Sequence, residues 1–236
     1  MMMPLRRLVR SAALATALTI ASASMASADT ISFSDIARGR YSTASNIGTA
    51  ANNFYGTGYF SGGPTSNSFT EWRSWFAFDL AGIGGTITSA ALQLNAGTYS
   101  SPDASETYEL HQVTTAVSAL GGVSNNGLIF TDLGDGPAYG THVFNASQNS
   151  STQLIALNAA AITDIQSALG QRFALGGLFT TLSRNEGVAE VAMFGTQANV
   201  SLILTRNDVQ AVPEPATLGL VATGLMALAR RRRRVS

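Results

Sequence analysis

The sequence predicts a mostly β protein, an antiparallel β-sandwich or jelly roll with one or two short helices. Short runs that alternate apolar and polar residues recur from residue 29 to residue 205, and this period of two is typical of half-buried strands. Clusters of Gly, Asn, Ser and Asp separate the runs, as in the turns of antiparallel sheets. Both observations argue against a parallel α/β sheet.

The clearest strand is predicted at residues 73–80. Alternation there places Ser74, Phe76, Phe78 and Leu80 on one face and Arg73, Trp75, Ala77 and Asp79 on the other. A glycine-rich turn follows at residues 82–85. We expect further strands at residues 86–95, 106–113, 141–144, 152–157, 172–180, 189–194 and 199–205.

One segment follows a helical period instead. In residues 158–170 the apolar positions recur three and four residues apart, which predicts an amphipathic helix. Asn158 is suited to cap its start and Gly170 to end it. Residues 114–120 are expected to form another short helical turn.

The N-terminus has the pattern of a signal peptide. Arg6, Arg7 and Arg10 precede a short apolar stretch at residues 11–20, and small residues at 26–28 supply a cleavage pattern. The sequence predicts a signal peptide at 1–28, with a helical apolar part and cleavage between Ala28 and Asp29. An N-terminal membrane helix is the alternative, which the short, Ala- and Ser-rich run disfavours. We therefore expect the folded ectodomain at 29–207.

Charge and composition exclude several classes of function. The formal net charge of the chain is zero, but residues 29–211 hold six arginines against thirteen acidic residues, a charge of −7. Such a body repels phosphate backbones, so no nucleic-acid partner is expected. The chain has no lysine and no cysteine, which excludes Schiff-base, P-loop and thiol chemistry and cysteine-ligated metals. We expect no cofactor.

The C-terminus combines three features. A linker at 208–215 contains Pro213, Glu214 and Pro215, and the two prolines keep this segment extended and accessible. An apolar run at 216–229 then predicts a membrane helix, which is short for a bilayer core of ~30 Å. Five arginines close the 216–234 anchor and hold this end in the cytoplasm by the positive-inside rule: Arg230, Arg231, Arg232, Arg233 and Arg234.

This tail resembles the PEP-CTERM sorting signal of Gram-negative bacteria, whose members are processed by the membrane protease exosortase. The resemblance implies recognition of Pro213, Glu214 and Pro215 by exosortase and cleavage nearby. It also implies export by the secretion machinery, a transient stay in the inner membrane, and a final place at the cell surface or in the extracellular matrix. The alternative is a single-span anchor that is never cut.

The body carries a second, weaker resemblance. Residues 73–92 look like the paired opening strands of jelly-roll modules in secreted bacterial proteins, some of which bind polysaccharide. Residues 103–110 and 130–134 are similar to stretches in other PEP-CTERM ectodomains. This likeness covers about residues 69–205. Its motifs mostly reflect packing of the fold and say little about activity.

Two groups of residues are candidates for ligand binding. Aromatic rings beside Asn and Ser on a glycine-rich loop are suited to stack on sugars, and the candidate glycan contacts are Tyr55, Tyr59, Phe60, Trp72 and Trp75. The alternative, which we favour, is that these rings plug the end of the sandwich. Asp132 and Asp135 form a weak Ca²⁺ candidate, for which a solvated turn is the favoured alternative.

Catalysis finds little support in the sequence. No Gly-x-Ser-x-Gly or His-Glu-x-x-His motif occurs, and the only histidines, His111 and His142, lie on different predicted strands. We expect His111 to point outward. The favoured function is a non-enzymatic structural or interaction protein of the cell surface or matrix, in biofilm and exopolysaccharide. The alternatives are an exopolysaccharide-binding module and, less favoured, a secreted hydrolase acting through two carboxylates.

Overall fold

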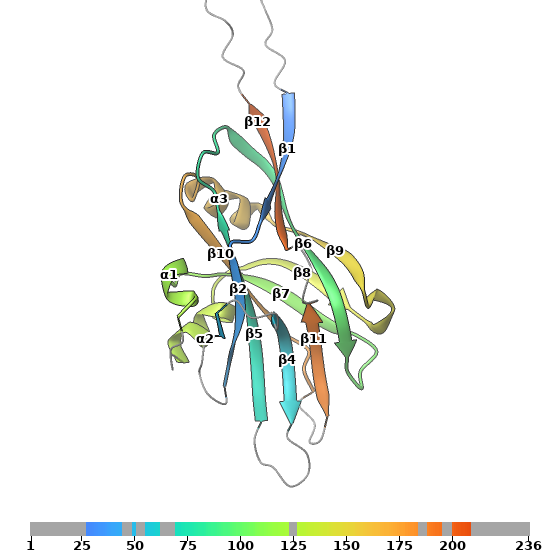
Figure 1. Cartoon of the computed structure of the whole chain (residues 1–236). Coiled ribbons are helices and arrows are strands. Elements are labelled where there is room, and N and C mark those ends of the chain that lie inside the picture. Colours follow the sequence, from blue (N-terminus) through green and yellow to red (C-terminus); the bar gives the residue numbers. More distant parts are fainter. Residues whose placement is uncertain are drawn as a thin grey trace, which may run out of the picture. The chain divides into compact units, whose positions relative to one another are not determined.

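The fold is mostly β and antiparallel, as predicted, in the computed structural model shown in Figure 1, and it has three short α-helices where one or two were expected. The structure describes residues 27–43, 49–50, 55–61, 69–122, 127–183, 188–194 and 200–208. Residues Ala28–Asp208 form one compact unit. The predicted signal peptide up to residue 26 and the C-terminal tail from residue 209 lie outside the described residues.

The described residues form twelve strands, three α-helices and one 3-10 helix. The strands are β1 Ser27–Ser34, β2 Ala37–Ser42, β3 Thr49–Ala50, β4 Tyr55–Ser61, β5 Phe69–Asp79, β6 Thr86–Ser100, β7 Glu106–Gln112, β8 Ala138–Phe144, β9 Ser151–Ala156, β10 Arg172–Phe179, β11 Ala189–Phe194 and β12 Ser201–Asp208. The helices are α1 Val117–Leu120, α2 Gly127–Asp135, η1 Ala146–Gln148 and α3 Ala159–Ser167. In this part of the chain no helix is long and apolar enough to cross a membrane.

The strands form one continuous sheet in the order β1-β12-β6-β11-β4-β5-β10-β7-β8. Two long strands organise it: β5 also pairs with β2, and β6 also pairs with β9. The last strand of the path, β8, approaches β9, which branches from β6, because the Asn158 amide after β9 donates to the Tyr139 carbonyl on β8 at 2.7 Å. The sheet therefore folds over a single interior, as in a sandwich.

The main core lies inside this fold. It contains Phe76 and Phe78 from β5, together with inward residues of β6 to β12 and of α3. The Tyr108 ring lies at its centre, edge-on to Phe144 and Phe194 with centroids 5.7 and 5.4 Å away. The predicted placing of Phe76, Phe78 and Leu80 on one face of the strand is therefore confirmed.

The opposite face of β5 is also buried. Trp75 and Ala77 pack with Tyr41, Ala174 and residues of α1 and α2 in a second cluster, on the left side of Figure 1. Trp75 is fully buried there. The central strands are thus covered on both sides, by the folded sheet and by the helices.

Two predicted helices are confirmed and one was missed. The helix α3 begins at the Asn158 cap, whose side chain accepts from the Ala161 amide at 3.1 Å, and Gly170 follows with a left-handed φ of 80°. The short α1 falls within the predicted turn at 114–120. The predicted turn at 132–136 was wrong, because most of it belongs to α2.

Candidate functional site

The aromatic residues proposed as glycan contacts do not form an exposed platform in the described part of the chain. The predicted loop is largely strand β4, and Tyr59 and Trp75 are 4 % and 0 % exposed. The core therefore leaves these two rings no exposed surface for a glycan, which agrees with the favoured alternative that the rings pack within the protein. The Arg40 guanidinium covers one face of Trp72, 3.9 Å from the ring centroid. The side chains of Tyr55 and Phe60 lie outside the described residues.

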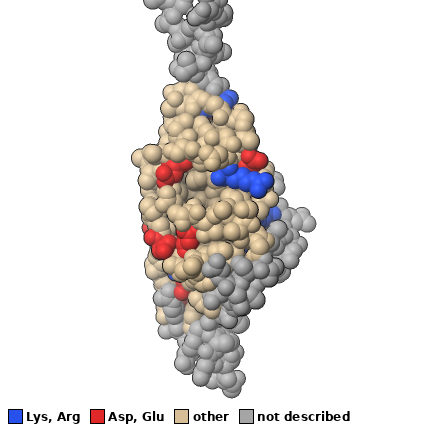
Figure 2. Space-filling view, turned by 90° about the vertical axis from the view of Figure 1, so that its left-hand side faces the viewer, with Lys and Arg blue, Asp and Glu red and all other residues tan. Residues whose placement is uncertain are grey.

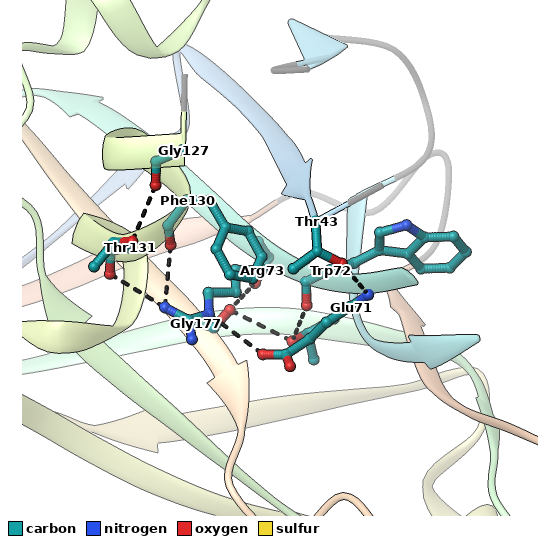
Figure 3. A network of polar contacts seen from close by, with 10 residues as sticks. Thr43, Glu71, Trp72, Arg73, Gly127, Phe130, Thr131 and Gly177 are labelled. Carbon is teal, nitrogen blue, oxygen red and sulfur yellow. Dashed lines mark hydrogen bonds and ion pairs between the residues drawn. The ribbon is translucent and has the colours of Figure 1, made fainter. Parts of the chain in front are cut away.

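A polar network beside these rings holds α2 against the sheet (Figure 3). Arg73 Nη1 donates to the carbonyls of Phe130 and Thr131, at 3.1 Å each. Its guanidinium lies over the Phe130 ring, 4.2 Å from the centroid, and Nε is 3.5 Å from Glu71 Oε1. The Arg73 cation thus joins β5 to the helix, and its surroundings indicate a packing role.

The acidic candidate has an internal structural role. The Asp132 carboxylate on α2 accepts from Thr114 N, Thr114 Oγ1 and Thr115 N, at 2.6–3.1 Å. Burial by itself would raise the pKa of Asp132, but these hydrogen bonds outweigh it and lower the pKa. Asp135 ends the same helix in an exposed position. No group of three His, Cys, Asp or Glu suited to a metal occurs among the described residues, and a Ca²⁺ site at this pair remains a prediction.

The histidines occupy separate environments. His111 is 8 % exposed, which makes its predicted outward position wrong, because the segment that follows α2 covers this face of β7. Its Nδ1 lies 2.8 Å from the Gly136 carbonyl, and its Nε2 lies 3.3 Å from Glu109 Oε2. His142 on β8 is hydrogen-bonded to Gln148 at 3.2 Å. Burial lowers the pKa of His142, and the Gln148 hydrogen bond opposes this shift.

The structure reveals a polar pocket that sequence reasoning missed. It has a volume of about 270 Å³ and lies between the 112–117 segment, α3 and the start of β10. Buried Tyr139 and Phe173 contribute to its lining, together with partly buried Gln112 and Asp164 and exposed Arg172.

Figure 2 shows the face on the left of Figure 1, where scattered acidic patches and a basic patch interrupt a mostly uncharged surface.

Hydrogen bonds hold the inner part of this pocket rigid. Tyr139 Oη donates to Asp164 Oδ2, and Gln112 Nε2 donates to the same oxygen at 3.1 Å. Burial and the neighbouring carboxylate raise the pKa of Tyr139, so its hydroxyl stays a proton donor at neutral pH. These residues come from β7, β8 and α3, and no motif in the sequence connects them.

Comparison with known families decides the identity of the C-terminal tail. Residues 211–234 match the family model described as the PEP-CTERM protein-sorting motif. The chain carries a PEP-CTERM sorting signal. The motif makes it an exosortase-sorted extracellular protein with a membrane-passing precursor and exosortase as its processing partner. No curated protein matched the chain.

In this PEP-CTERM protein, the strands next to the two chain ends are neighbours. The first strand, β1, pairs with the last, β12, and Figure 1 shows them side by side. Asp29 Oδ2 on β1 lies 3.3 Å from Arg206 Nη2 on β12. The chain therefore enters β1 and leaves β12 at the same end of the ectodomain. The predicted cleavage between Ala28 and Asp29 falls in the first residues of β1.

Proposed function

We propose that this protein is a structural or interaction protein of the cell surface or extracellular matrix, released from an inner-membrane precursor by cleavage near Pro213-Glu214-Pro215. The observation that carries this proposal is the PEP-CTERM motif at residues 211–234. The apolar run and the five terminal arginines support a temporary anchor, because the run is short for a stable span.

The geometry of the ectodomain is compatible with release at that position. Its last described strand, β12, ends at Asp208, and the motif begins at residue 211. Cleavage near residues 213–215 removes no residue of β12 and leaves the β1–β12 pairing whole. The released body therefore keeps the fold described above, with its formal charge of −7 in residues 29–211.

A second candidate function is binding of exopolysaccharide. The observation that favours it is the polar pocket beside Asp164 and Arg172; the buried rings of Tyr59 and Trp75 do not support it. We favour a non-enzymatic role over a hydrolase. In support, the buried carboxylate of Glu106 accepts from the hydroxyls of Ser101 and Thr181, at 2.9 and 2.5 Å, which leaves it poorly placed as an acid or base.

Fractionation of host cells tests the proposed location. The change is a triple alanine substitution of Pro213, Glu214 and Pro215, and the matched control replaces Val209 and Gln210 by alanine outside the motif. We expect the unaltered and control chains in the surface and matrix fraction, and the motif variant in the inner membrane. Equal release of all three proteins would contradict the proposal.

A further inference from the structure

The polar pocket has the features of a built binding site for a small hydroxylated ligand. Asp164 lines the pocket, and its Oδ2 atom accepts hydrogen bonds from Gln112 and Tyr139. The other oxygen, Oδ1, has no hydrogen-bond donor among the described residues. The two donors fix the carboxylate in place, and Oδ1 stays available to accept from a ligand hydroxyl.

A positive group lies at the exposed rim of the same pocket. Arg172 begins β10 and is exposed, and within the described ranges no hydrogen bond or ion pair engages its guanidinium. The body of the protein has only six arginines against thirteen acidic residues. A free guanidinium beside a pocket in such a protein favours a ligand with a carboxylate, because Arg presents two parallel donors to that group.

The part of the pocket lining before α1 is held in place by Asp132 of α2. Asp132 accepts from both Thr114 and Thr115, which line the pocket. The pocket therefore does not depend on a ligand to order this segment. Preorganisation of this kind lowers the entropic cost of binding.

The size of the pocket limits the ligand. A volume of about 270 Å³ falls just below the ~300–1,000 Å³ of sites for drug-sized molecules. A pocket of this volume is large enough for a single sugar unit. The aromatic residues Tyr139 and Phe173 are buried in its floor, so recognition would come from polar groups at the walls and rim.

We propose that this pocket binds one uronate unit of an acidic polysaccharide. Arg172 pairs with the sugar carboxylate at the rim, and Asp164 Oδ1 accepts from ring hydroxyls inside. The choice of a polysaccharide as the source of the ligand rests on the proposed location at the cell surface.

Isothermal titration of the full chain in detergent tests this inference. The probes are methyl glucuronide, methyl glucoside and acetate. We expect the glucuronide to bind at least about tenfold more tightly than the glucoside or acetate, since charge-assisted pairs are the stronger hydrogen bonds. Arg172→Gln should remove the preference for the glucuronide. Arg206→Gln removes the same charge on β12, whose residues do not line the pocket, and should preserve it.

Two further variants test the inner part of the pocket. Asp164→Asn should weaken binding of both sugars. Because it also alters the contact with Tyr139, Ala116→Phe provides an independent test by adding a ring at the exposed rim. It should abolish binding while the thermal midpoint stays at the wild-type value.

Three outcomes would overturn the inference. They are the absence of any glucuronide binding, a preference that survives Arg172→Gln, and acetate binding as tight as that of the glucuronide, which would mean an adventitious ion only. The titration measures the purified protein, whereas the proposed location is tested by fractionation of cells. Failure of one is therefore distinguishable from failure of the other.

Discussion

Replacement of Gly177 by alanine tests how closely the Tyr108 ring packs against β10. A Cβ atom at Gly177 would lie 2.8 Å from Tyr108 Cε2 and nearer still to its Cζ and hydroxyl. Tyr108 is fully buried, and its hydroxyl is 2.7 Å from Ser74 Oγ. The ring therefore cannot move away without breaking this hydrogen bond.

The expected loss of stability follows from three contributions. Overpacking of a filled core costs ~1–3 kcal/mol, and loss of the Tyr108–Ser74 hydrogen bond costs ~1 kcal/mol. The smaller entropy of the unfolded alanine chain offsets ~0.4–1 kcal/mol. The free energy of unfolding of Gly177→Ala should thus fall by about 2 kcal/mol, which lowers the thermal midpoint by ~4–8 °C in a domain of this size.

Urea unfolding of the detergent-solubilised full chain, followed by tryptophan fluorescence, measures this change. The matched control is Gly84→Ala, because a Cβ there meets nothing within 4 Å, and its stability should stay within ~0.5 kcal/mol of wild type. Addition of Tyr108→Phe removes the nearest clashing atom, so the double variant should lose less than the sum of the two single losses. A Gly177→Ala protein as stable as the control would refute the packing described for β10.

Two further variants and one titration test the polar contacts. Asp132→Ala should destabilise by ~1–2 kcal/mol near neutral pH, as loss of a capping side chain does. Because the folded pKa of Asp132 is lowered, the difference in urea midpoint from wild type should disappear as pH falls below ~3.9 and through that folded pKa. Arg73→Met removes two charged hydrogen bonds and should cost ~1.5–3 kcal/mol, with faster amide exchange in α2; unchanged exchange would contradict the role of Arg73. His142 should titrate below ~6.5 by NMR. Its contribution to stability, present above the unfolded pKa, should be lost as pH falls from there through the lower folded pKa; a higher titration point would show that burial does not control it.

Strands and helices such as β11 and α3 were predictable from sequence, because the pattern that indicates each of them lies within a single run of residues. The predicted strand at 189–194 coincides with β11, and the predicted helix contains α3 with its Asn158 cap. In each case apolar residues on one face of a single element carry the signal. The C-terminal motif was predictable for the same reason, since its three features follow one another along the chain.

Elements stabilised by distant contacts were not predictable. The helix α2 contains Gly127 and Gly134, which lower helix propensity, and it is held by burial of Ile129 and Leu133 and by Arg73. In β4, a Cβ at Gly58 would lie 2.7 Å from Val191 Cα. This glycine permits close approach of a neighbouring strand, although its residue type indicated a loop.

The candidate pocket could not be found from sequence for a related reason. Gln112, Tyr139, Asp164 and Arg172 are separated by up to sixty residues along the chain, and only the sheet topology brings them to one pocket. Conversely, the aromatic residues near residue 60 formed a local pattern that suggested a surface. Pairing of β4 with β5 and β11 instead buries Tyr59.

The mass of the intact protein extracted from the cell surface is the most direct test of the proposed function. Processing near Pro213-Glu214-Pro215 predicts a chain that begins near Asp29 and lacks the apolar run and all five arginines of Arg230–Arg234. A surface protein whose mass includes that tail on most molecules would contradict release by exosortase and would leave the tail as a permanent anchor.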